Sequence, residues 1–247
     1  MTLRDRTILV TRPADEGASL AATLRDAGAM VIEGPAIEIE QPSDWSELDD
    51  AIRQLAAGEF EWVSFTSPRA ADAVCERLRR FGLPPRLPAK VAVVGPTTAK
   101  KLRESGVEVD LLADPHTTES LAEQFPSGDG RVLMPRADIA PEGLEAALEG
   151  KGWTAVRVEA YRTRFPNELP AEAREALENG RVDAVTFTSP STVQGLMRLA
   201  SLPEDVDVVC IGPVTAEAAG RAGLSVAAVA TPHTVDGIVR ALENLYS

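Results

Sequence analysis

The sequence predicts an α/β protein with doubly wound parallel sheets, and three observations support this fold class. Short apolar, β-branched runs alternate with stretches in which apolar residues recur at helical spacing. The runs are nearly continuous, as is typical of parallel strands covered on both faces. The order of motifs also repeats in the two halves of the chain. We therefore expect about ten strands and about ten helices, shared equally between two five-stranded sheets.

Six apolar runs mark the strands, and a turn containing Ser, Thr, Gly or Pro follows each of them. They are TILVT (7–11), WVSFT (62–66), VAVVG (91–95), VLMP (132–135), AVTFT (184–188) and VVCIG (208–212). The stretch AADAVCERLRRF (70–81) has apolar residues three and four positions apart, which predicts a helix. Strands that alternate with helices indicate βαβ units and a parallel sheet.

The tetrapeptide Phe-Thr-Ser-Pro occurs twice, around Ser67 and around Ser189, and the flanking motifs recur in the same order. The motif Pro-His-Thr, for example, appears at His116 and again at His233. The pattern indicates a duplication of about 120 residues, which is too long a period for a solenoid. Two similar domains, or two interleaved ones, follow from it.

Each Phe-Thr-Ser-Pro segment has a structural explanation as the junction between a strand and a helix. Ser67 is well placed as a helix N-cap, and Pro68 fits the first turn, where no backbone N–H is needed. Ser189 and Pro190 repeat the arrangement. The same junction leaves free N–H groups and a positive dipole end at the carboxyl edge of the sheet, where doubly wound sheets bind ligands.

The charge balance limits the possible partners. With 25 Lys and Arg against 38 Asp and Glu, the formal net charge is −13, which argues against a general nucleic-acid binder. Any anionic ligand must therefore be attracted by local Arg side chains and backbone N–H groups rather than by the overall field.

Neither export nor a membrane is indicated. No apolar run is long enough to span a bilayer, and the N-terminus lacks signal-peptide anatomy, so we expect a cytoplasmic protein. Cys75 and Cys210 both lie within apolar patterns and suggest neither a disulfide framework nor a zinc site.

The loops after the strands resemble one another and indicate an anion site. They read TRPADEG, FTSPRA, VGPTTA, PRADIA, FTSPST and IGPVTA. None is a P-loop or a dinucleotide fingerprint, so a mononucleotide or flavin site is not supported. They present hydroxyls, N–H groups and guanidinium groups, which suit carboxylates or phosphates. Arg12, Arg69 and Arg136 lie at such junctions, although an Arg in this position is often an ordinary surface residue.

Histidine and tyrosine are two further residue types that could take part in chemistry. His116 and His233 are better explained by a shared structural loop than by a paired acid–base site, since no metal-ligand spacing surrounds them. Tyr161, in VEAYRTR, lies where the chain leaves one domain. On residues alone it is slightly better explained as a linker aromatic that packs on a helix than as a residue facing an interdomain cleft.

The ordered set VTRP, FTSPRA, VGPTTA, EAYRT, FTSPST and IGPVTA, followed by PHTVDGIVRAL, resembles the uroporphyrinogen-III synthase family over almost the whole chain. The resemblance implies two flavodoxin-like α/β domains joined by a two-stranded β-ladder. The domains would comprise residues 1–38 with 166–247 and residues 43–157, and the ladder residues 37–42 and 158–165.

The resemblance also implies an activity. The family cyclises the linear tetrapyrrole hydroxymethylbilane to uroporphyrinogen III, with loss of water, inversion of the terminal pyrrole and no cofactor or metal. Tyr161 matches the tyrosine thought to assist departure of the hydroxyl as water, which makes it the expected catalytic residue. The expected substrate-binding residues that match family motifs are Ser67, Arg69, Thr98, Ser189 and Thr234, to which junction position adds Arg12 and Arg136.

The sequence is compatible with three functions. The first is the enzyme, acting as a monomer on a small-molecule tetrapyrrole with no nucleic-acid or membrane partner. The second is a non-catalytic relative that binds a tetrapyrrole or another polycarboxylate as a sensor or regulator. The third is a periplasmic solute-binding protein, which would need an export signal. Tyr161 favours the enzyme.

Overall fold

A computed structural model describes residues 3–247 and divides the chain into two compact units. Unit 1 comprises Met1–Ile39 and Arg164–Ser247, and unit 2 comprises Glu40–Thr163. Eleven strands and ten helices lie within the described residues, against the ten strands expected from the sequence. Among these helices none is both long and apolar enough to cross a bilayer.

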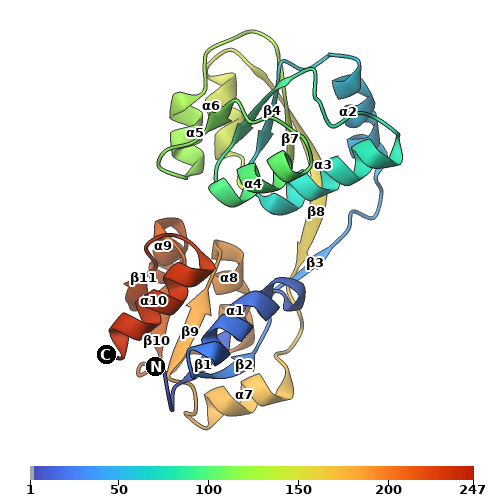
Figure 1. Cartoon of the computed structure of the whole chain (residues 1–247). Coiled ribbons are helices and arrows are strands. Elements are labelled where there is room, and N and C mark those ends of the chain that lie inside the picture. The colour runs from blue at the N-terminus through green and yellow to red at the C-terminus, as the bar shows by residue number, and fades with distance from the viewer. Residues whose placement is uncertain (1–2) are drawn as a thin grey trace. The chain divides into compact units, whose positions relative to one another are not determined.

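Unit 1 is a five-stranded parallel sheet with helices on both faces (Figure 1). Its strands are β1 (Thr7–Val10), β2 (Met30–Glu33), β9 (Ala184–Phe187), β10 (Asp207–Cys210) and β11 (Val226–Val229), in the order β11-β10-β9-β1-β2. Its helices are α1 (Ala14–Asp26), α7 (Ala171–Glu178), α8 (Pro190–Leu199), α9 (Pro213–Arg221) and α10 (Val235–Leu245). One apolar cluster joins the sheet to α7, α8 and α9, and another joins it to α1 and α10. The short strands are buried on both faces by these two layers.

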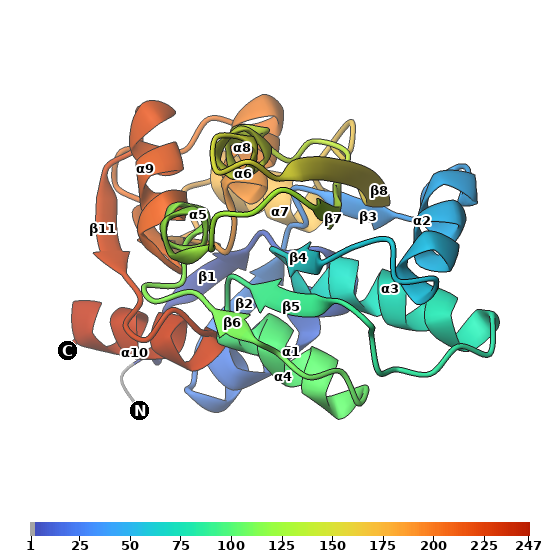
Figure 2. The ribbon, with the colours of Figure 1, turned by 90° about the horizontal axis from the view of Figure 1, so that it is seen from above.

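Unit 2 repeats this plan with a sixth strand. Its sheet consists of β3 (Glu38–Glu40), β4 (Trp62–Phe65), β5 (Lys90–Val93), β6 (Leu111–Leu112), β7 (Arg131–Ala137) and β8 (Thr154–Arg164), in the order β3-β8-β7-β4-β5-β6. Of β3 only Glu40 falls within unit 2, since Glu38 and Ile39 belong to unit 1. The helices of unit 2 are α2 (Ser46–Ala56), α3 (Pro68–Arg80), α4 (Pro96–Glu104), α5 (Thr118–Gln124) and α6 (Gly143–Glu149). Figure 2 shows α3 and α4 on one side of β4 and β5, and α5 and α6 on the other.

The strand orders explain the duplication seen in the sequence. Without β3, unit 2 reads β8-β7-β4-β5-β6, and unit 1 reads β2-β1-β9-β10-β11. Each unit therefore takes two neighbouring strands from one half of the chain and three from the other. Unit 1 has the 2-1-3-4-5 order of flavodoxin-like sheets, and unit 2 has the same order when its strands are numbered from β7, which makes it a circular permutation of unit 1. The predicted fold class is confirmed: two duplicated, interleaved, doubly wound parallel sheets.

The strand beyond the five-stranded pattern is β3, which lies next to β8 in the six-stranded sheet. It has only three residues, all part-exposed or exposed. Strand β8 is one continuous strand of 11 residues, and Tyr161 lies on it. The stretches around Glu38 and Tyr161, expected as the two strands of a ladder, thus lie beside each other as an extension of the sheet of unit 2.

Candidate active site

The carboxyl edge of each sheet, where its parallel strands end, carries the residues singled out in the sequence. In unit 1 the direction of winding changes between β1 and β9, because α1 and α8 pack on opposite faces. In unit 2 the same change falls between β7 and β4, followed by α6 and α3. Ligands of doubly wound sheets bind outside the strand ends at such switch points.

In unit 1, Arg12 and Ser189 follow the two neighbouring strands at the switch point. Ser189 is the N-cap of α8, and its Oγ accepts a hydrogen bond of 3.3 Å from the Thr192 backbone N–H. The Thr192 Oγ1 accepts in return from the Ser189 N–H, which completes a capping box. Arg12 is half-buried just after β1. The predicted N-cap and the proline after it are confirmed.

In unit 2, the equivalent loop after β4 carries Ser67 and Arg69. The Ser67 Oγ accepts a hydrogen bond of 3.2 Å from the Ala70 N–H, so the predicted cap of α3 is confirmed as well. Arg69 is half-buried in the first turn of α3. Thr98 lies in the first turn of α4 and is only 3% exposed. Its burial leaves little surface for a substrate group to contact, and a role for Thr98 in binding stays a prediction.

Arg136, added from its position at a junction, lies on β7 with only 4% of its surface exposed. Its Nη1 donates a hydrogen bond of 2.7 Å to Glu145 Oε2, and these two side chains form a buried ion pair. The Arg136 Nε is buried without a hydrogen-bond partner. A role in binding substrate carboxylates would require this pair to open, and it stays a prediction.

Tyr161 lies on β8, opposite Ala137 of β7, where the register of the two strands shifts by one residue. Glu159 pairs with Arg136 and Tyr161 with Ala137, so Ala160 is the extra residue of a β-bulge. Bulges re-aim side chains and are frequent beside active sites. Tyr161 is half-buried and packs against the apolar cluster that joins the sheet to α2, α3 and α4. Part of the Tyr161 side chain is therefore held by packing, and part of it is accessible to solvent.

The two Pro-His-Thr loops are structural equivalents. The Nδ1 atoms of His116 and His233 lie 2.6 Å and 2.7 Å from the carbonyl oxygens three residues earlier. Thr117 and Thr234 cap α5 and α10, accepting from Ser120 N–H and Gly237 N–H at 3.1 Å. Within the described part of the chain, no cluster of His, Cys, Asp or Glu side chains could hold a metal ion.

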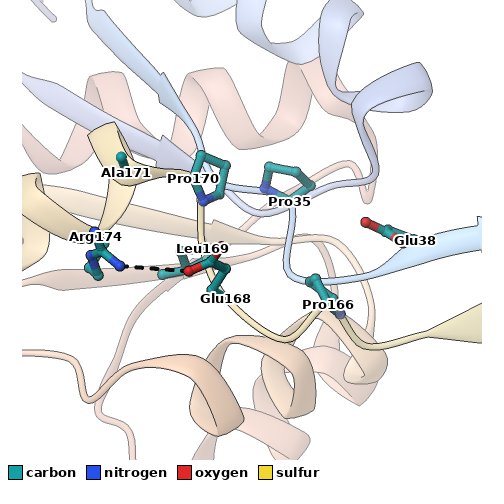
Figure 3. A pocket seen from close by; sticks show the side chains of 8 residues that line it. All are labelled: Pro35, Glu38, Pro166, Glu168, Leu169, Pro170, Ala171 and Arg174. Carbon is teal, nitrogen blue, oxygen red and sulfur yellow. Dashed lines mark ion pairs between the residues drawn. The ribbon is translucent and has the colours of Figure 1, made fainter.

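Cavities lie within each of the two units. Figure 3 shows one of about 320 Å³ in unit 1, lined by Pro35 and Pro166 and by the ion pair of Arg174 with Glu168, whose charged atoms are 3.8 Å apart. A second, of about 880 Å³, lies near the amino ends of the strands of unit 1. Neither is lined by a predicted site residue.

The third cavity lies in unit 2, and one of its lining residues, Ala137, pairs with Tyr161 across the two strands. It measures about 430 Å³ and is lined by the 137–140 loop together with Arg157 and Glu159 of β8. The motif PRADIA includes this loop, but the sequence pattern indicates no role for Asp138 or Arg157. Arg157 donates hydrogen bonds to backbone carbonyls of the loop, and Asp138 accepts one from the Thr163 N–H. Bonds to backbone atoms leave no residue pattern to recognise.

A family model described as uroporphyrinogen-III synthase HemD matches residues 18–240. The chain belongs to the uroporphyrinogen-III synthase family. A uroporphyrinogen-III synthase from Synechococcus elongatus is 35% identical over 96% of this chain and 94% of its own length. A putative uroporphyrinogen-III synthase from Methanothermobacter thermautotrophicus is 32% identical over 94% of this chain and 96% of its own.

Solved structures of the family share the fold. A mutant uroporphyrinogen III synthase from Thermus thermophilus superposes with a TM-score of 0.75 at 22% identity, covering 97% of this chain and 98% of its own. The corresponding protein from Helicobacter pylori superposes with a TM-score of 0.62 at 17% identity, covering 97% and 99%. At these identities the superpositions support the architecture of two α/β sheets.

Proposed function

We propose that this chain cyclises hydroxymethylbilane to uroporphyrinogen III in haem biosynthesis, as a monomer in the cytoplasm. The observation that carries the proposal is the 35% identity over 96% of the chain with a uroporphyrinogen-III synthase. The reaction removes the terminal hydroxyl as water and closes the ring with the last pyrrole inverted. It needs no cofactor or metal.

Tyr161 is the proposed catalytic residue. Departure of a hydroxyl as water requires a proton on the leaving oxygen, and a phenol O–H is a suitable donor. The azafulvene formed in this step would be attacked by the terminal pyrrole to give a spiro intermediate, which rearranges to the inverted product. The β-bulge at Tyr161 supports this assignment, because it sets the direction of the side chain.

The proposed carboxylate-binding groups lie at the carboxyl edges of both sheets. Ser67, Ser189 and Thr234 begin helices whose N-termini present N–H groups and a positive dipole end. Arg12 and Arg69 add guanidinium groups beside them. These local groups are needed because the net charge of −13 repels an octacarboxylate overall.

Positioning is the second proposed contribution to catalysis. Hydroxymethylbilane closes spontaneously to isomer I, so the enzyme must hold the chain so that the inverting closure is faster. Holding reacting atoms in contact can contribute about 7–11 kcal/mol to lowering a barrier. Binding the substrate carboxylates at several fixed loops would provide this orientation.

The experiment that tests the proposal supplies freshly made hydroxymethylbilane and resolves isomers I and III after oxidation. Predominant isomer III is the expected result, and the enzyme-free reaction is the internal control. Isomer I alone, formed at the uncatalysed rate by well-folded protein, would contradict the proposal and favour a binding protein for a tetrapyrrole or another polycarboxylate.

A further inference from the structure

The loop of residues 137–140, which connects β7 to α6, is held by one arginine of β8. The Arg157 guanidinium donates hydrogen bonds of 2.9 Å to three carbonyl oxygens, those of Ala137, Asp138 and Ala140. Its Nη1 also lies 3.7 Å from Glu145 Oε1, and Glu145 is the buried partner of Arg136. A planar guanidinium is the side chain best suited to several acceptors in fixed directions.

Asp138, in the same loop, binds the β8 backbone on both sides of Arg162. Its N–H donates a hydrogen bond of 3.1 Å to the Tyr161 carbonyl. Its Oδ1 accepts a hydrogen bond of 2.9 Å from the Thr163 N–H. Because β7 ends at Ala137, Asp138 prolongs the pairing of the two strands, with a carboxylate in place of a backbone carbonyl.

These bonds lie at the bulge that orients Tyr161. The register shift between Arg136 and Ala137 weakens the regular ladder at the point where Tyr161 lies. The direction of a side chain is set by its own backbone, and Asp138 holds that backbone from Tyr161 to Thr163. A small displacement of a reacting group reduces the rate steeply.

We infer that Asp138 and Arg157 are positioning residues that fix Tyr161 for the reaction, Arg157 by shaping the loop and Asp138 by tying it to the β8 backbone. This inference rests on the proposed function of Tyr161. In this role the 137–140 loop fixes the orientation of the Tyr161 phenol and does not itself bind the substrate carboxylates.

The chain offers a matched control in the same unit. Asp110 also accepts a hydrogen bond from a strand backbone, with its Oδ2 2.8 Å from the Val91 nitrogen. It directly precedes β6 and bonds to the amino end of β5, away from the carboxyl edge that carries Tyr161. Asp110→Ala removes a bond of the same kind without touching the 137–140 loop.

The test measures kcat and KM for isomer III with Asp138→Ala, Asp138→Asn and Arg157→Lys, each with Tyr161 and with Tyr161→Phe. Asp138→Ala and Arg157→Lys should lower kcat about 10-fold with Tyr161 present and cause no further loss in Tyr161→Phe. Asp138→Asn keeps an acceptor for Thr163 and should restore most of the rate. Asp110→Ala should leave kcat within about 2-fold. Equal losses in both backgrounds, or no rescue by Asn, would overturn the inference.

A second readout does not depend on turnover. The chain has only two tyrosines, Tyr161 and Tyr246, so fluorotyrosine labelling yields two assignable ¹⁹F signals. Asp138→Ala should shift or broaden the Tyr161 signal and leave that of Tyr246 unchanged, and Asp110→Ala should move neither. An unmoved Tyr161 signal in Asp138→Ala would overturn the inference. Isomer I alone from the wild-type protein would instead contradict the proposed function.

Discussion

Units 1 and 2 are built from the same strand order but differ where the proposed chemistry lies. In unit 1 the strand beside β1, away from β9, is β2, which has four residues. Its counterpart in unit 2 is β8, which lies beside β7 and has 11 residues. Only β8 continues to Tyr161 and carries the bulge beside β7. In unit 1, β1 passes into α1 within three residues, whereas in unit 2 the loop after β7 is tied back by Arg157 and Asp138. The two units thus share one strand order, and the proposed reactive group, Tyr161, lies on the strand by which they differ.

The Phe-Thr-Ser-Pro loops show the same division on a smaller scale. Both serines cap a helix, but Ser189 gains a reciprocal bond from Thr192, while Ser67 is followed by Arg69. In the loop of unit 1, the side chains of Ser189 and Thr192 therefore satisfy more of the backbone N–H groups at the start of the helix. The loop of unit 2 offers a guanidinium instead, which suits it to binding a carboxylate.

The first prediction concerns the phenylalanines that end the equivalent strands. Phe65 and Phe187 are fully buried, one in each unit, so Ala at either position should cost about 3–5 kcal/mol of unfolding free energy in its own unit. The three tryptophans, Trp45, Trp62 and Trp153, all lie in unit 2. Tryptophan fluorescence therefore reports unit 2, and circular dichroism reports both units.

Phe65→Ala should move the fluorescence transition in urea to lower concentration, and Phe187→Ala should move only the dichroism transition. If both probes shift together in both variants, the two units unfold as one, and the expected difference between them is contradicted.

The buried ion pair of unit 2 gives the second prediction. Removing one partner of such a pair leaves an uncompensated charge, so Arg136→Met should cost about 3–5 kcal/mol, read by tryptophan fluorescence. The double variant Arg136→Met with Glu145→Leu should recover much of this loss. A stable Arg136→Met protein with a raised KM would instead assign Arg136 to the substrate, as its junction position in the sequence suggested.

Arg69 gives the third prediction, which separates the two Phe-Thr-Ser-Pro loops by function. Arg69→Ala removes a proposed carboxylate ligand and should raise KM about 10-fold, since a charge-assisted hydrogen bond contributes about 1.5–3 kcal/mol. The matched variant in the other loop is Ser191→Ala, for which we expect a KM close to that of the wild type. Steady-state rates of isomer III formation measure both. Equal KM effects would contradict the proposed difference.

The smallest expected effect concerns Tyr246 of unit 1. Its hydroxyl oxygen lies 2.9 Å from Asp207 Oδ2 and 3.1 Å from the Asp183 carbonyl oxygen, and its single proton is shared between these two acceptors. Tyr246→Phe should cost about 1 kcal/mol at neutral pH. Burial, followed by the hydrogen bond to Asp207, raises the pKa of Tyr246 in the folded chain above its ordinary value.

A raised pKa stabilises the folded state fully below the unfolded pKa of about 10, and this contribution is lost as the pH rises above it. The stability difference between wild type and Tyr246→Phe should therefore shrink above pH 10, as measured by urea titrations followed by circular dichroism. A difference that grows with pH would contradict the raised pKa.

The sequence predicted those features that depend on local patterns. The Ser-Pro caps, the buried strands and the duplication were all recognisable, because each has its own residue signature. The burial of Arg136 was not, since its partner Glu145 lies nine residues later, on the next helix, and only folding brings the two together. The bonds of Asp138 and Arg157 to backbone atoms could not be foreseen either, because any residue can supply a carbonyl or an N–H.

The central claim is that Tyr161, on strand β8 of unit 2, donates the proton with which the substrate hydroxyl leaves as water. Its most direct test is the rate of isomer III formation by Tyr161→Phe, which keeps the ring and removes the hydroxyl. We expect kcat to fall about 100-fold with little change in KM and an unchanged circular dichroism spectrum. An unaltered kcat in the folded variant would contradict the account and place the proton donor elsewhere.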